Sequence, residues 1–238
     1  MGVLSIISST VLKESPEQSS NLMGGQLTPI EPGDYECDRV EVLRDHFCVS
    51  NGHRVYWVWR GVAKAEVSPP LQVPYYSQRD NSGQWWRECN SSSCAMVAEY
   101  YRPECLAGSD DRYVRLVNQF GDTTDHWAQT KALDALNIRS RFATDLGYER
   151  VVESLARHNP VVLGVLHRGT LDTPEGGHMI VAVGTYAEGL ICHDPWGEGF
   201  SYVSHNGKNV KYPLKSLDRR WLVDGDNNGW GRLFMGEA

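Results

Sequence analysis

Three residues in this chain have the types and spacing of a thiol active site. Cys89 opens a polar stretch that runs into an apolar segment, so it stands where a helix could begin. His178 follows two glycines at the start of an apolar, strand-like segment, and Asp194 ends the next such segment. A thiol attacks a carbonyl as the thiolate, which a helix N-terminus and an imidazolium both favour, while a carboxylate can orient the imidazole. The combination predicts nucleophilic acyl transfer.

Taken singly, each of these residues has a simpler interpretation. Most cysteines in helical surroundings are small buried hydrophobes, and Cys94, inside the same expected helix, is interpreted in that way. A lone histidine beside an apolar strand is more often structural, and Asp194 before Pro-Trp-Gly could form a turn. The joint placement favours catalysis, because strands at 178–185 and 189–194 would form a hairpin in which His178 faces Asp194.

Acyl transfer also needs hydrogen-bond donors for the oxyanion that develops on the attacked carbonyl. The side-chain amide of Gln78 can supply one N–H, and the backbone of Cys89 can supply another. Gln84 competes with Gln78 because it is nearer to Cys89 in the sequence, and the residues alone leave the choice open. Three further residues beside these groups are expected to contact substrate: Asn90, Gly177 and Trp196.

A break at Ser68-Pro69-Pro70 separates the domain that must position these groups from the residues before it, since Pro-Pro continues neither a helix nor a strand. Residues 27–68 have a strand-like pattern with a strong hairpin turn at Asn51-Gly52, and they predict a small all-β module. Residues 1–26 are polar with little periodicity and are expected to be flexible. The module is expected to support the structure or to bind a ligand.

Residues 71–238 predict an α+β domain, in which helices come first and an antiparallel sheet follows. The helix after Cys89 is expected to run from about Ser91 to Tyr101, with serine side chains as N-caps. A β-rich tail with Trp221 and Trp230 is expected to end the domain. Further helices are predicted at about 110–119, 126–136 and 148–158, with another strand at 160–167.

Composition narrows the classes of protein and site. The net charge of −7 and the lack of a basic stripe argue against nucleic acid as a partner. No apolar run reaches the roughly 18 residues of a membrane span, and the N-terminus lacks the features of a secretory signal. We therefore expect a soluble protein made in the cytoplasm, without a membrane partner.

The six cysteines do not form a disulfide framework, and none lies in a Cys-x-x-Cys motif. Cys37 and Cys48 could pair across a hairpin, but a reduced pair is the expectation. Cys192 and His193 are neighbours on one expected strand, so their side chains point to opposite faces and do not share a metal ion. No metal and no cofactor are expected.

Four motifs in order resemble the C39-like cysteine peptidases, whose fold is papain-like. They are Val-Pro-Tyr-Tyr-Ser-Gln (73–78), Cys-Asn-Ser-Ser-Ser-Cys-Ala-Met-Val (89–97), Gly-Gly-His-Met-Ile-Val-Ala-Val-Gly (176–184) and His-Asp-Pro-Trp-Gly (193–197). The resemblance spans about residues 71–235. It implies that Cys89 is the nucleophile, His178 the general base and acid, Asp194 the orienting carboxylate and Gln78 an oxyanion donor.

Other stretches look like a C39-like subgroup of bacteria, cyanobacteria and their phages, some of which are thought to hydrolyse cell walls. These are residues 121–125, 207–212 and 220–225, while residues 10–20 are similar to the N-terminal SH3-like part of that subgroup. Two departures stand out. Asn90 follows the nucleophile where many members have glycine, and the spacing from Gln78 to Cys89 is longer than in the peptidase domains of bacteriocin transporters.

The sequence therefore predicts a cysteine peptidase that cleaves peptide bonds of peptidoglycan as a bacterial or phage lysin, an endolysin or virion-associated enzyme. The SH3-like module would bind the cell wall, to which the protein would be released or carried. Two alternatives stay open. One is a peptidase that processes proteins, and the other is a non-catalytic module that binds peptides or glycans and retains the fold.

Overall fold

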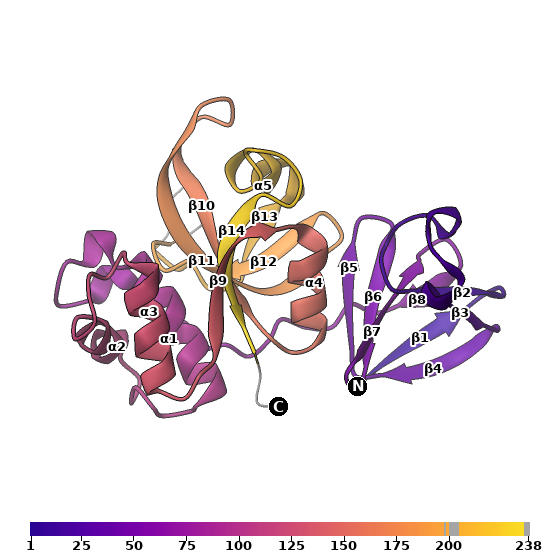
Figure 1. The fold of residues 1–238 in the computed structure, drawn as a ribbon, viewed down its shortest axis with the longest axis horizontal. Coiled ribbons are helices and arrows are strands. Elements are labelled where there is room, and N and C mark those ends of the chain that lie inside the picture. The colour runs from indigo at the N-terminus through magenta and orange to yellow at the C-terminus, as the bar shows by residue number, and fades with distance from the viewer. Residues whose placement is uncertain (198, 200–204, 236–238) are drawn as a thin grey trace.

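A β-rich N-terminal region and a larger body of helices around one sheet follow one another along the chain (Figure 1). The structure is a computed structural model that describes residues 1–197, 199 and 205–235, so the last three residues of the predicted domain 71–238 lie outside it. None of the helices in the described residues is both long enough and apolar enough to cross a membrane.

The N-terminal region contains two small antiparallel sheets. One has the strand order β4-β1-β8 and the other β3-β2-β7-β6-β5. The Asn51-Gly52 turn connects β6 to β7, as predicted, with Asn51 opposite Arg54. The strands are β1 (Gly2–Ile6), β2 (Thr10–Lys13), β3 (Leu27–Ile30), β4 (Gly33–Cys37), β5 (Arg39–Leu43), β6 (His46–Asn51), β7 (Arg54–Trp59) and β8 (Ala63–Ala65).

The expectation of a flexible segment at residues 1–26 is wrong, because β1 and β2 belong to these sheets. Strand β1 pairs with a neighbour on each side, and its Leu4 and Ile6 point into a core shared with Val40 and Val58. Two inward side chains on a five-residue strand are too short a pattern to stand out from a polar sequence. Two short 3-10 helices, η1 (Ser19–Asn21) and η2 (Gly24–Gln26), complete the segment.

The body has a six-stranded antiparallel sheet with the strand order β13-β12-β11-β10-β14-β9. Its α+β class is as predicted. The strands are β9 (Ser140–Leu146), β10 (Val161–Gly169), β11 (Pro174–Tyr186), β12 (Gly189–His193), β13 (Val210–Pro213) and β14 (Gly229–Phe234). The helices are α1 (Cys89–Tyr101), α2 (Asp110–Val117), α3 (His126–Ala135), α4 (Tyr148–Ala156) and α5 (Leu214–Arg220), with the 3-10 helices η3 (Gln78–Asp80) and η4 (Trp85–Arg87).

Two parts of the predicted order differ from the structure. Strand β9 lies between α3 and α4, so the helices do not all precede the sheet, and the tail contains α5 as well as strands. Strand β9 mixes charged, polar and apolar residues without regular alternation and pairs at the sheet edge with β14, so its local signal is weak. Helix α5 spans only seven residues, which is too short for a helical period to show in the sequence.

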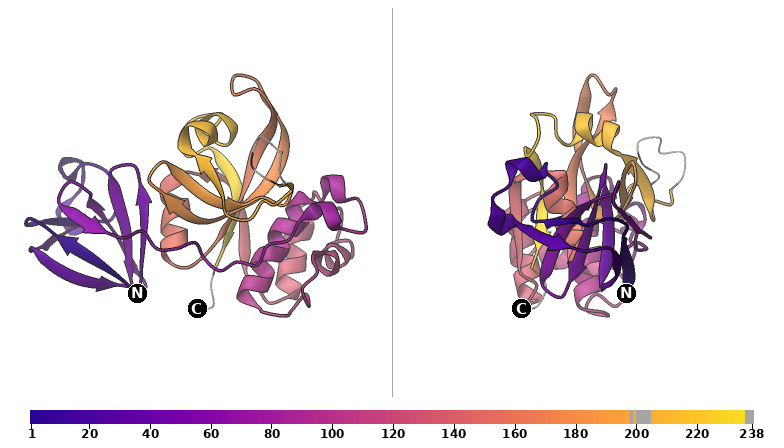
Figure 2. Two further views of the ribbon diagram at one scale, coloured as in Figure 1. Left: turned by 180° about the vertical axis from the view of Figure 1, so that it is seen from behind. Right: turned by 90° about the vertical axis from the view of Figure 1, so that its right-hand side faces the viewer.

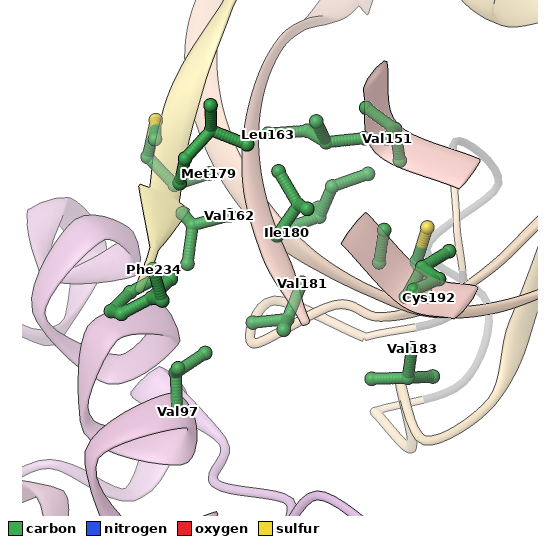
Figure 3. Close-up of a cluster of buried hydrophobic side chains, with 14 of the residues drawn as sticks. Val97, Val151, Val162, Leu163, Met179, Ile180, Val181, Val183, Cys192 and Phe234 are labelled. Carbon is green, nitrogen blue, oxygen red and sulfur yellow. The ribbon is translucent and has the colours of Figure 1, made fainter. Parts of the chain in front are cut away.

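Strand β11 is the centre of the core. Every residue from His178 to Thr185 is buried, and a strand covered on both faces has the continuous apolar run seen in this sequence. Helix α1 packs on one face and α4 on the other, as Val97 and Val151 show on opposite sides of Val181 and Ile180 (Figure 3).

The segment between the two regions ties them together. From β8 it crosses past the strands of the body to the helices (Figure 2), and Leu71 N–H donates to the Val183 carbonyl at 2.7 Å. Strand β5 packs against α4 and β11, where Val42 N–H donates to Thr185 Oγ1 at 2.9 Å. The β-rich region therefore contacts the body at the end of β11 remote from His178.

Candidate active site

Cys89 is the first residue of α1, and its side chain is half-buried. The helix begins there because the tight turn of η4 ends just before it. Glu88 occupies the N-cap position but makes no side-chain cap, since its carboxylate accepts bonds from Asn81 and from the Gln84 backbone, each at 2.9 Å. The N-terminal amides of α1 thus keep their positive end toward the thiol rather than toward a capping side chain.

The sequence predicted that serine side chains after Cys89 would cap α1. They do not cap it but bond to neighbouring segments from within the helix. Ser91 bonds to Thr123 at 2.6 Å, Ser92 donates to Asp110 at 2.5 Å and Ser93 donates to the Met179 carbonyl at 3.0 Å. The last of these bonds ties α1 directly to β11, beside His178. Cys89 is therefore held at a fixed place relative to the sheet.

His178 and Asp194 lie next to each other, with His178 Nε2–H donating to Asp194 Oδ1 at 2.7 Å. Antiparallel pairing of β11 with β12 opposes Val181 and His193, which places the residue after β12 near the start of the buried part of β11. Both side chains are almost fully excluded from solvent, at 3% exposure for His178 and 0% for Asp194.

The Asp194 carboxylate accepts hydrogen bonds from two further groups that were not predicted from the sequence. Trp196 N–H donates to Oδ1 at 2.8 Å, and the Tyr212 hydroxyl donates to Oδ2. The Tyr75 hydroxyl donates to the Asp194 backbone carbonyl at 3.0 Å and so fixes the loop. A carboxylate that accepts this many hydrogen bonds is restrained in orientation.

The charge state of His178 follows from these neighbours. Burial alone would lower the pKa of His178, but the charge and hydrogen bond of Asp194, with a hydrogen bond to Cys89, raise it to about 10. Asp194 occupies Nε2, so Nδ1 is the ring nitrogen left for the thiol. An imidazolium beside Cys89 is the arrangement that stabilises a thiolate.

Gln78 and Gln84 lie in different surroundings. Gln78 is buried at 1% exposure, its backbone N–H donates to the Pro195 carbonyl at 2.9 Å, and its side-chain Nε2 donates to the Trp85 carbonyl at 2.6 Å. Gln84 is exposed and its Oε1 accepts from Arg87 at 3.2 Å. One amide hydrogen of Gln78 is thus used as an anchor while the second is left for another acceptor.

The three expected substrate contacts fall in three different settings. Asn90 is buried, donates to His126 Nδ1 at 3.3 Å and accepts from Cys94, so its side chain bonds to helices α3 and α1, and its contact with substrate stays a prediction. Gly177 is exposed on β11 directly before His178. Trp196 is half-buried and stacks on Trp85, with ring centroids 5.6 Å apart.

Sequence reasoning missed Trp85, Tyr75 and Tyr212. The stack of Trp85 on Trp196 joins η4 to the loop after β12, and the Arg79 guanidinium lies 5.1 Å from the Trp196 ring centroid. Tyr75 and Tyr212 lie inside stretches already noted for their resemblance, which was the only signal available. Their contacts depend on strand order, which no local pattern encodes.

Among the described residues, no group of three His, Cys, Asp or Glu side chains could hold a metal ion. Cys192 is fully buried, and His193 donates to the Val73 carbonyl at 2.9 Å while its Nδ1 accepts from Asn209 at 3.1 Å. All six cysteines, Cys37 and Cys48 included, are free thiols.

Comparisons with known proteins identify a family and two solved structures to which this chain is similar. The model of the Peptidase_C39 like family matches residues 70–227, which is well over half of the chain. A C39-like peptidase from Bacillus anthracis has a similar structure, with a TM-score of 0.51 and 15% sequence identity over 72% of this chain and 100% of that one. A double glycine motif protease from an AMS/PCAT transporter, solved with a leader peptide, gives a TM-score of 0.46 and 17% identity over 71% and 94% of the two chains. No curated protein matches.

Proposed function

The chain belongs to the Peptidase_C39 like family and is a C39-like cysteine peptidase, and from that premise we propose that it hydrolyses peptide bonds of peptidoglycan with Cys89, His178 and Asp194 as catalytic residues. The observation that supports these roles is the buried His178–Asp194 pair, 2.7 Å apart, facing a cysteine at the start of a helix. A helix N-terminus and an imidazolium together favour the thiolate that attacks the carbonyl.

In the proposed mechanism the Cys89 sulfur forms a bond to the carbonyl carbon of the substrate. The oxyanion accepts hydrogen bonds from the free amide hydrogen of Gln78 and from the Cys89 backbone N–H. The His178 imidazolium then gives its Nδ1 proton to the leaving amine as the C–N bond breaks, which leaves a thioester on Cys89. Neutral His178 takes a proton from water, whose oxygen displaces the sulfur, and Asp194 keeps the ring in one orientation throughout.

A wall substrate is supported by the N-terminal region, which we propose is an SH3-like module that binds the cell wall. Trp59 is 51% exposed and lines two open cavities of about 550 and 450 Å³. Asp45 lines both cavities, and Lys64 and Thr10 line one each. An exposed aromatic ring among charged and hydroxyl groups suits a polar polymer, because the ring offers apolar area while its neighbours supply hydrogen bonds.

The test is the release of amines from purified peptidoglycan by the wild type and by Cys89→Ala, with mass spectrometry of the soluble fragments. Release by the wild type alone supports the proposal and identifies the bond. Release by both proteins contradicts the role of Cys89. Cleavage of unfolded protein with no release from walls would point to a protein-processing peptidase, and no cleavage of either substrate would favour a binding module.

The module is tested separately with Trp59→Ala. This variant is expected to reduce co-sedimentation of the protein with intact walls while leaving the cleavage of soluble stem peptides unchanged. Equal sedimentation of the two proteins would contradict the proposed wall site at Trp59.

A further inference from the structure

His167 is a second histidine that contacts the imidazole of His178. The two ring centroids are 4.9 Å apart, with the planes inclined by 50°. The contact follows from sheet register, because His178 lies directly opposite Val165 on β10 and His167 is the next residue of β10 on that same face. His167 is therefore the diagonal neighbour of His178.

The hydrogen bonds of His167 set its tautomer. Its Nδ1 lies 2.7 Å from the Gly176 carbonyl, which can only accept, so Nδ1 carries the proton. Its Nε2 accepts a hydrogen bond from Arg168 Nε at 3.2 Å and therefore has no proton. His167 is neutral in this arrangement, with both ring nitrogens engaged.

Several charged groups face His167. Burial, the charge of His178 and the charge of Arg168 lower the pKa of His167 to about 4, against opposing contributions from the Gly176 carbonyl and Asp194. At pH values well above 4, the ring next to the His178 imidazolium thus carries no second positive charge. It covers that imidazolium without repelling it.

Arg220 fixes the stretch of β10 that carries His167. Strand β14 pairs with β10 at Val162 and Leu163. Farther along β10, Arg220 of α5 is a hydrogen-bond donor to the strand's backbone. This nearly buried guanidinium donates to three backbone carbonyls that flank or follow His167, at Leu166 (2.8 Å), Arg168 (2.9 Å) and Gly169 (3.0 Å). Figure 1 shows α5 beside the projecting β10–β11 hairpin.

The backbone on both sides of His167 is therefore held from one edge, while its side chain is held by Gly176 from the other. We infer that His167 is a positioning residue for His178, and that Arg220 holds His167 in place. The inference rests on the proposed catalytic role of His178. His167 covers one face of the imidazolium and limits rotation of the ring, so that Nδ1 stays toward Cys89 while Nε2 stays on Asp194. A displacement of about 1 Å at a reacting group can cost on the order of 100-fold in rate.

The first test is the rate at which iodoacetamide alkylates Cys89, measured from pH 4 to pH 8 with the full chain. His167→Ala is expected to lower the rate at pH 6 roughly tenfold, because the His178 ring loses its support. His167→Phe keeps a ring of similar size and is expected to remain within about threefold of the wild type at pH 6. It also lacks the group that titrates near pH 4, so its acid limb should differ from the wild-type one. His53→Ala, an exposed histidine in the β6–β7 turn, is the matched control and should follow the wild type.

The second test separates positioning from stability. Arg220→Gln is expected to lower the alkylation rate in the wild-type background but to add little in the His167→Ala background, because both changes act on the same ring. Near-ultraviolet circular dichroism and the melting temperature of each variant report folding. Independent, multiplying losses from the two substitutions would overturn the coupling between Arg220 and His167.

The outcomes distinguish this inference from the proposed function. If wild-type Cys89 reacts no faster than a free cysteine at pH 6, the proposed catalytic pair itself fails. If the wild type reacts fast and folded His167→Ala reacts equally fast with the same pH profile, the catalytic pair stands and the positioning role of His167 is wrong. If His167→Ala does not fold, His167→Phe decides: a rate at pH 6 near that of the wild type supports positioning by the ring, and a loss beyond tenfold contradicts it.

Discussion

A buried ion pair lies near each end of strand β11, and only one of the two pairs has the features of an active site. Near the start of β11, His178 pairs with Asp194. Near the other end, the Thr185 hydroxyl donates to Glu41, and Arg39 Nε donates to the same carboxylate at 2.6 Å. We call these the active-site pair and the junction pair. All four charged side chains are nearly excluded from solvent.

The two pairs differ in what their cations can do. The junction pair has a guanidinium, a group that does not exchange protons in protein chemistry, whereas His178 can release a proton and hydrogen-bonds to Cys89. Burial raises the pKa of Glu41 although Arg39 and Thr185 act against it, so the charged carboxylate is a cost to the fold. Asp194 and Cys89 outweigh burial and raise the pKa of His178. A buried ion pair alone is therefore weak evidence of catalysis, and a titratable partner facing a nucleophile is strong evidence.

The largest expected effect comes from removing the nucleophile. Cys89→Ala should reduce peptide-bond hydrolysis by about 10³-fold or more, because no other group at the site forms the covalent intermediate. The fold should survive, since Cys89 is only half-buried. Initial rates on soluble stem peptides measure the loss, and residual hydrolysis within tenfold of the wild type would rule out the proposed chemistry.

Replacing the carboxylate of each pair by its amide tests directly whether the two pairs differ in function. Asp194→Asn should lower kcat/KM by on the order of 10² to 10⁴, because the imidazole loses its charged partner and its tautomer. Glu41→Gln should leave kcat/KM per folded molecule unchanged but cost about 3 kcal/mol of unfolding free energy, since Arg39 stays buried without its counter-charge. Steady-state kinetics and urea unfolding give kcat/KM and the unfolding free energy of both variants. A loss of kcat/KM in Glu41→Gln similar to that in Asp194→Asn would contradict the functional difference between the two pairs.

Gln78→Ala should have a smaller kinetic effect than Asp194→Asn. Loss of one oxyanion donor typically costs about 10² to 10³ in kcat. Gln84→Ala is the matched control, because Gln84 is exposed and bonds to Arg87, and it should leave kcat unchanged. The reverse order of the two effects would transfer the oxyanion role to Gln84.

The pH dependence of stability also separates the pairs. The pKa of His178 in the folded protein lies above the ordinary value of 6.5, so its stabilising contribution is complete below about pH 6.5 and is lost as the pH rises toward 10. Wild-type unfolding free energy should fall over this range. The fall should be shallower in Asp194→Asn and unchanged in form in Glu41→Gln, and urea titrations at a series of pH values would show it.

The smallest effect is expected at the junction. Thr185→Val removes the hydroxyl that donates to Glu41 and accepts from Val42 N–H, and should cost about 1 to 3 kcal/mol of unfolding free energy. Hydrolysis should not change, because Thr185 is seven residues along β11 from His178. A change in kcat at Thr185 would show that the junction is coupled to the active site.

The sequence predicted that His178 faces Asp194, because this contact depends on neighbouring segments of the chain. Two neighbouring strands joined by a short turn bring His178 to Asp194, and the polar-to-apolar change at Cys89 marks the start of a helix. Helices α2, α3 and α4 were likewise close to their predicted ranges, and in α2 and α4 the buried apolar residues recur at helical spacing.

What the sequence did not predict depends on pairing between distant segments. Tyr212 reaches Asp194 only because β13 pairs with β12, and Glu41 reaches Thr185 only because the N-terminal region packs on the end of β11. Strand β1 was missed because two inward side chains in five residues are a weak signal. Such contacts follow from strand order and docking, which residue types and local spacing do not encode.

The central claim is that His178 is an imidazolium held between Asp194 and Cys89, and a nuclear magnetic resonance titration of its ring tests this most directly. The wild-type ring should stay protonated through neutral pH and titrate near pH 10, and the value should drop in both Cys89→Ala and Asp194→Asn. A wild-type ring that titrates near 6.5 and is insensitive to both substitutions would contradict the account.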